Sequence, residues 1–164
     1  MKKILTLSLF LLISISHAAS GSTQIEIVEY GIYTSEIIGT VYAPLTTSGK
    51  YNLVKNVTLV KKTDKIPATR GTKFGLFYII KGDFEGEEIK ITEIVKFPNP
   101  GYRDPNTGKL FRKSEFSSMK KVGSKNFVAG MFAEDWDLFP GKWKVQLWYK
   151  KHKLAEKSFI VFKP

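Results

Sequence analysis

The sequence predicts an all-β protein, an antiparallel two-sheet β-sandwich of about eight strands. Its hydrophobic residues come in short extended runs, and clusters of Gly, Pro, Asn and Asp separate these runs. No stretch after the N-terminal segment has the spacing of an amphipathic helix, and nothing repeats at a fixed period. About eight short runs in roughly 140 residues is the spacing that a two-sheet sandwich needs.

The N-terminal segment has the three parts of a secretory signal peptide. Lys2 and Lys3 precede an apolar run at 4–15, and small residues at 16–19 suit a signal peptidase. The run is shorter than the ~20 residues of a membrane-spanning helix. We therefore expect residues 1–19 to be a cleaved signal peptide and residues 20–164 a single β-sandwich domain. The mature chain is expected to lack a transmembrane segment and to be exported, to the periplasm or out of the cell.

The charge of the chain narrows the classes of partner. Basic residues number 26 against 15 acidic ones, and the formal net charge is +11. The arginines are only Arg70, Arg103 and Arg112, whereas base readout and bidentate phosphate binding favour arginine. We therefore expect no nucleic-acid partner. The lysines suit either solubility or contact with anionic lipid and polysaccharide outside the cytoplasm.

The first strands are expected at 24–33, 37–42 and 57–62. Within the first of these, the apolar residues shift phase by one position, which predicts a β-bulge near Val28. The absence of cysteine means that burial alone must stabilise these strands against one another.

The middle of the chain predicts a second hairpin. The run at 74–80 is apolar on both faces, as in a strand at the centre of a packed sheet. A turn at 82–88 is expected to return the chain as a strand at 89–97. The next segments are an irregular proline-rich connection, an edge strand and a short strand, at 98–106, 110–116 and 127–132.

The stretch 133–162 predicts the last hairpin of a sheet. It holds all three tryptophans and ends in a strand, a tight basic turn and a closing strand. Alternation from 142 to 150 predicts a core face made of Trp143, Val145, Leu147 and Tyr149. The solvent face comprises Lys144, Gln146, Trp148 and Lys150. Leu154 is out of phase with Phe159, which predicts another bulge.

Several short motifs resemble a known family. They are DWDL at 135–138, PGKW at 140–143, KLAEKSF at 153–159, VEYGIY at 28–33 and NTGK at 106–109. The pattern is similar to a family of short, exported bacterial domains of unknown function. This resemblance implies an immunoglobulin-like β-sandwich. It implies no activity, ligand or catalytic residue.

The candidate binding residues cluster around one tryptophan. Trp148 lies on the predicted solvent face with Lys144, and the turn beside it carries Lys150, Lys151 and Lys153. An aromatic ring among cations can contact a sugar or a lipid interface while the lysines hold phosphate or carboxylate groups. The alternative is that Trp148 packs under a neighbouring segment and that the lysines are only solvated.

The residues of the sequence do not indicate a catalytic, metal or cofactor site. His152 is the one histidine outside the predicted signal peptide and there is no cysteine, so neither a triad nor a His-based metal site can be assembled. The acids around Trp136 lack the ligand spacing of a calcium loop. We expect Trp136 and Leu138 to close one end of the sandwich instead.

Two hypotheses of function follow. The first is an exported, non-catalytic interaction module of the cell envelope, which binds another protein through an exposed strand edge and its last hairpin. The second is a binder of anionic envelope lipid or polysaccharide through the basic aromatic hairpin around Trp148.

Overall fold

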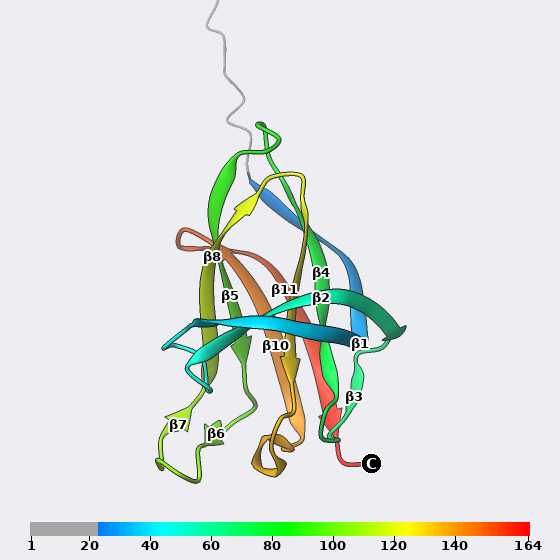
Figure 1. Ribbon diagram of the computed structural model, residues 1–164, viewed down its shortest axis with the longest axis vertical. Coiled ribbons are helices and arrows are strands. Elements are labelled where there is room, and N and C mark those ends of the chain that lie inside the picture. Colours follow the sequence, from blue (N-terminus) through cyan, green and yellow to red (C-terminus); the bar gives the residue numbers. More distant parts are fainter. Residues whose placement is uncertain (1–22) are drawn as a thin grey trace, which may run out of the picture.

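The computed structural model describes residues 23–164, which form two packed β-sheets (Figure 1). The predicted signal peptide lies outside these residues. The elements are β1 (Gln24–Tyr42), β2 (Lys50–Lys61), β3 (Lys65–Pro67), β4 (Lys73–Lys81), β5 (Glu88–Lys96), β6 (Tyr102–Arg103), β7 (Leu110–Phe111), β8 (Lys113–Lys121), β9 (Lys125–Met131), the 3₁₀ helix η1 (Asp135–Asp137), β10 (Gly141–Tyr149) and β11 (His152–Phe162).

The strands are arranged as the two layers of a β-sandwich. One sheet has the strand order β2-β1-β4-β9, and the other has the order β3-β11-β10-β5-β8. A two-stranded sheet of β6 and β7 lies at one end. All pairs are antiparallel except the short parallel contact of β3 with β11. The predicted all-β, two-sheet sandwich is confirmed.

The core lies between β4 of the first sheet and β10 and β11 of the second. β4 runs between β1 and β9, as its two-sided apolar pattern predicted. Its inward side chains are almost fully buried, and they meet the buried face of the last hairpin. Gly75 is required in β4, because a Cβ there would collide with the Val128 carbonyl and the Ala129 backbone of β9.

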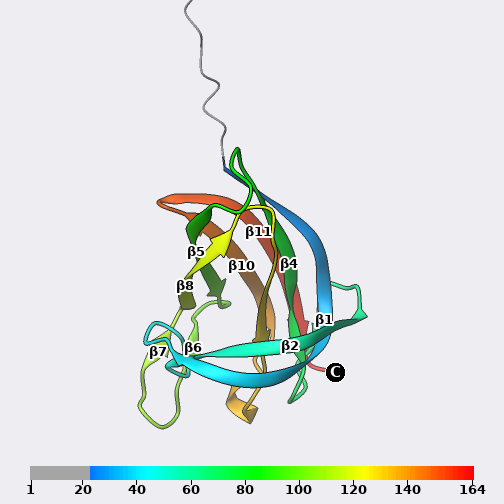
Figure 2. The ribbon, with the colours of Figure 1, turned by 45° about the horizontal axis from the view of Figure 1, so that its top comes forward.

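β1 is one bent strand of 19 residues, not the two strands expected from the sequence. A register shift between Ile27 and Glu29 confirms the predicted bulge, and further shifts follow along its pairing with β2. Pairing with β4 ends at Tyr33, so the second half of β1 pairs with β2 alone. Figure 2 shows this two-stranded segment curving across the sandwich. We call residues 32–61 the β1–β2 ribbon.

The hairpin predicted for 74–97 is wrong. β4 and β5 belong to different sheets, and the turn between them crosses from one layer to the other. Both edges of β4 are occupied, by β1 and β9, so β5 has no free edge to join there. It pairs instead with β10 and β8.

The predicted last hairpin is confirmed. β10 pairs with β11, and Trp143, Val145 and Leu147 are buried as expected. The second predicted bulge lies at Leu154, where the register skips between Lys153 and Ala155. β5 covers the outer side of β10, whereas β3 covers only the last three residues of β11, Ile160–Phe162.

Candidate functional site

The predicted residues around Trp148 form a network that includes one carboxylate. Glu156 on β11 accepts from Lys153 at 2.7 Å and from Gln146 at 2.7 Å, and its other oxygen lies 3.1 Å from Nζ of Lys144. These hydrogen bonds, that of Lys153 first, lower the pKa of Glu156 to about 2. Two of the four predicted lysines are thus already paired.

Trp148 itself is half-buried on the outer face of β10. Its Nε1 donates to Oε1 of Gln146 at 3.1 Å, so the indole N–H is already bonded. Lys150 and Lys151 are exposed in the turn, and Nζ of Lys150 lies 4.9 Å from the centre of the Tyr149 ring. The structure therefore places Trp148, Lys150, Lys151 and Lys153 at the turn end of the hairpin, whereas Lys144 lies about 13 Å further along β10. Part of the Trp148 ring surface remains accessible to solvent.

Most of the lysines that share this face were not predicted from the sequence. Directly paired residues of antiparallel strands lie on the same side of a sheet, and the register assigns seven outward lysines to β5, β8, β10 and β11. We call these residues the basic face: Lys90, Lys96, Lys113, Lys121, Lys142, Lys144 and Lys153. Only the strand pairing brings them together, because they come from four separate segments.

The β1–β2 ribbon carries most of the exposed apolar surface. Seven of the thirteen large hydrophobic residues that are exposed within residues 23–164 belong to it: Ile37, Ile38, Val41, Tyr42, Leu45, Leu53 and Val60. Tyr42 is 83% exposed, and Leu45 and Val60 are more than 60% exposed. β2 is also an edge strand, and no other described strand pairs with its outer side.

The ribbon is fastened to the other sheet by Tyr51. Its hydroxyl donates to Oε2 of Glu93 at 2.9 Å, and its ring stacks on Phe116 with centroids 3.9 Å apart. Glu93 is 3% exposed and also accepts from Tyr78 at 2.9 Å, with Nζ of Lys120 3.3 Å away. Burial, with the Glu93 charge as a second cause, raises the pKa of both tyrosines.

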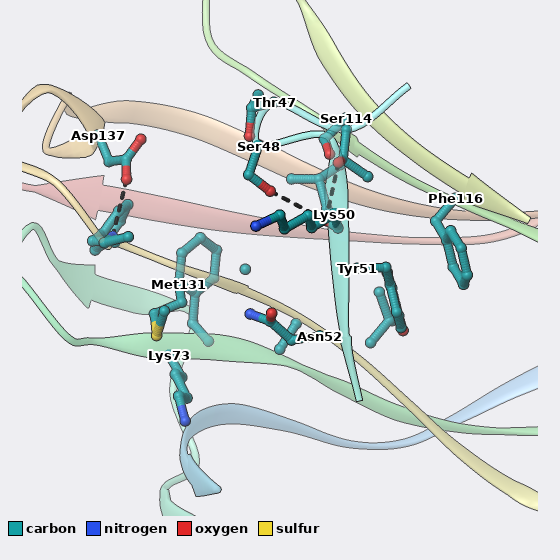
Figure 3. Close-up of a pocket in the computed structure, with 18 of the residues that line it drawn as sticks. Thr47, Ser48, Lys50, Tyr51, Asn52, Lys73, Ser114, Phe116, Met131 and Asp137 are labelled. Carbon is teal, nitrogen blue, oxygen red and sulfur yellow. Dashed lines mark hydrogen bonds between the residues drawn. The ribbon is translucent and has the colours of Figure 1, made fainter. Parts of the chain in front are cut away.

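A cleft of about 860 Å³ lies under the ribbon. Figure 3 shows Lys50 and Asn52 of β2 on one side, with Met131 of β9 and Asp137 of η1 nearby. Ser114 and Phe116 come from β8. Of these side chains, those of Lys50, Asn52, Ser114 and Asp137 can form hydrogen bonds with a polar molecule in the cleft. The size of the cleft is within the usual range of small-molecule sites.

The acids around Trp136 have structural partners. Oδ2 of Asp137 accepts from the backbone N–H groups of Ala133 and Glu134, at 2.9 and 3.0 Å, and so holds the η1 turn. Trp136 stacks on Tyr102 with centroids 4.9 Å apart. Burial first, and then the charge of Asp137, raises the pKa of Tyr102. Across residues 23–164, no three acidic or histidine side chains are placed to hold a metal ion. The same residues contain no helix that is long and apolar enough to cross a membrane.

The architecture and its comparisons define the class of protein. A crystal structure of an immunoglobulin-like protein from Pseudomonas aeruginosa matches with a TM-score of 0.59 and 26% sequence identity, over 88% of this chain and 100% of that one. The fold is therefore an immunoglobulin-like β-sandwich, as the sequence resemblance implied. Residues 21–161 match the domain of unknown function DUF3859, and the chain belongs to this family. No curated protein matches it.

Proposed function

We propose that this chain is an exported, non-catalytic interaction module of the cell envelope, which binds a partner protein through the β1–β2 ribbon. The observation that carries the proposal is the exposed apolar surface of the ribbon together with the free edge of β2. The immunoglobulin-like sandwich supports it as a scaffold for recognition, and the N-terminal pattern supports export.

The apolar residues favour a protein partner. Contiguous apolar surface is uncommon on monomeric proteins and marks interaction sites. Val41 pairs with Tyr51 on the inward face of the ribbon, whereas Tyr42 is on the opposite face and is almost fully exposed. Tyr42 pairs with Lys50, so Tyr42 and Val60 lie about 33 Å apart along β2. An extended partner segment along β2 would bury both side chains, which the fold itself leaves in water.

The edge of β2 favours a partner that supplies an extended segment. An unpaired edge presents backbone N–H and C=O groups that another strand can bond. Lys50, Lys55 and Lys61 lie along β2, and of these only Lys55 has an ion pair among the described residues, 3.4 Å from Glu36. The remaining cations favour an acidic segment. On the last hairpin, β5 covers β10 and β3 covers residues 160–162 of β11, so the free edge there is confined to residues 152–159 of β11.

The test is capture of envelope proteins on the immobilised mature chain, residues 20–164, with a wash at high salt. We compare the native chain with a double variant, Tyr42→Glu with Val60→Glu, which alters exposed positions only. We expect a discrete protein to survive the wash on the native chain and to be lost from the variant, because salt screens exposed charges but not apolar contacts.

The matched control is Phe84→Glu, in the turn between β4 and β5. Phe84 is 72% exposed, so the substitution has the same chemistry on a surface far from β2 in the fold. It should retain the captured protein. Equal loss on both variants, or capture of polymer alone at low salt, would refute the ribbon as the binding surface.

A further inference from the structure

The basic face contains a row of three directly opposed lysines. Lys96 on β5 pairs with Lys113 on β8 and with Lys144 on β10. The row points outward, because the next residues along β5 and β10, Val95 and Val145, pack in the core. Like charges directly opposite one another destabilise a sheet. A bound anion would therefore reduce the electrostatic repulsion among the three lysines on these adjacent strands.

The charge of this face is only partly balanced. The outward positions of the same four strands hold the seven lysines of the basic face, but the only acids among them are Glu88, Glu115 and Glu156. Glu115 pairs with Lys113, and Glu156 pairs with Lys144 and Lys153. Lys96 is exposed and has no ion pair within residues 23–164. The centre of the row is thus an unpaired cation between two others.

The other side chains of the face suit a sugar chain better than a bilayer. Trp148 is in the same face, four residues or about 13 Å along β10 from Lys144. Its neighbour in the adjacent strand is Thr92, whose hydroxyl bonds to that of Ser117 at 2.8 Å. A half-buried indole with a bonded N–H offers a ring surface for stacking, whereas an interfacial anchor needs a protruding ring.

The exposed apolar residues of this face do not form a membrane-binding patch. Met119 lies on β8, whereas Ile160 and Phe162 are two residues apart on the outer face of β11, and β5 and β10 separate this pair from Met119. Bilayer binding by an interfacial surface depends on continuous buried apolar area. The face instead carries a row of three lysines on strands about 4.8 Å apart, with one aromatic surface further along β10.

We propose that the basic face binds a linear acidic polysaccharide. The polysaccharide runs obliquely over the face. Its carboxylates meet the row of Lys113, Lys96 and Lys144, and a sugar ring about 13 Å further along β10 contacts Trp148. This site is separate from the protein-binding ribbon, because β2 belongs to the other sheet.

The test measures binding of fluorescent polygalacturonate to the mature chain at low ionic strength. The variant is Lys96→Gln with Lys90→Gln, two exposed lysines of β5 that have no ion pair in the described chain. It removes charge without breaking a contact of the fold. The control, Lys61→Gln with Lys163→Gln, changes the net charge equally at exposed positions outside the face.

We expect the face variant to bind at least tenfold more weakly and the control to change by less than threefold. Thermal stability of the face variant should be unchanged or higher, because repulsion within the row is reduced. Equal weakening of both variants would mean that net charge alone attracts the polymer. Absence of binding by the native chain, or binding only to phosphatidylglycerol vesicles, would also overturn the proposal.

Discussion

Replacing Tyr51 with phenylalanine tests how the β1–β2 ribbon is held on the sandwich. The substitution keeps the ring that stacks on Phe116 and removes only the hydroxyl that donates to Glu93 at 2.9 Å. Glu93 is buried, so the lost donor cannot be replaced by bulk water without opening the structure. Tyr78 and Lys120 still contact the carboxylate.

The magnitude follows from the kind of hydrogen bond that is lost. A hydrogen bond to a charged group contributes about 1.5–3 kcal/mol to stability. Because Glu93 keeps two of its three partners, we expect Tyr51→Phe to lower the free energy of unfolding by about 2 kcal/mol. For a domain of this size, that corresponds to a fall in Tm of roughly 5–10 °C. Hydrogen exchange in β2 should become faster, since the ribbon loses an anchor.

The assay is urea denaturation of the mature chain, with Tyr42→Phe as the matched control. Tyr42 is on the same ribbon but is 83% exposed, so the loss of its hydroxyl should change the unfolding free energy by less than about 0.5 kcal/mol. The m-value should be the same for all three proteins. If Tyr51→Phe were as stable as the native chain, the Tyr51–Glu93 bond would not be what fastens the ribbon.

Three further predictions concern the sheets. The pKa of Glu156 is about 2 in the folded chain against an ordinary value of 4.5. The contribution of the ionised carboxylate to stability is therefore complete above pH 4.5 and is lost as the pH falls toward 2. The Tm of Glu156→Gln should depend less on pH over that range than the Tm of the native chain. Gly75→Ala should cost about 3 kcal/mol or more, because its Cβ meets β9 backbone, and should abolish a cooperative melt or lower its Tm steeply. Trp148→Ala should cost about 1–2 kcal/mol in chemical denaturation, as for a half-buried ring; a loss above 4 kcal/mol would place Trp148 in the core.

The strands could be predicted wherever one face is buried. Trp143, Val145 and Leu147 alternate with polar residues because only one side of β10 meets the core, so the period of two is visible in the sequence. The two-sided apolar pattern of β4 was equally clear, because β4 is central in its sheet. Both bulges were visible as changes of phase.

Strand pairing and the ribbon could not be predicted from the same signals. Whether β5 returns beside β4 depends on which edges are already occupied, and no local pattern reports that. The far half of the ribbon has no buried face that continues along its length, so its apolar residues do not alternate regularly. Its apolar exposure therefore became clear only from the fold.

In the candidate site, too, features local in sequence could be predicted, whereas features that depend on strand pairing could not. Trp148 and Lys144 were found because they are close in sequence and in phase on one strand. Lys96 and Lys113 were missed because their place in one row with Lys144 depends on the register of three strands. The pairing of Glu156 with Lys144 was missed for the same reason, and its pairing with Lys153 was missed because the bulge at Leu154 puts these two residues on one face of β11.

The central claim is that the β1–β2 ribbon contacts a partner protein, and site-specific photocrosslinking in cells tests it most directly. A benzophenone amino acid replaces Tyr42 on the ribbon or, as the control, Phe84 in the turn between β4 and β5, since both positions are more than 70% exposed. We expect a discrete crosslinked protein from position 42 and none from position 84. No adduct at position 42, or the same adduct at both positions, would contradict it.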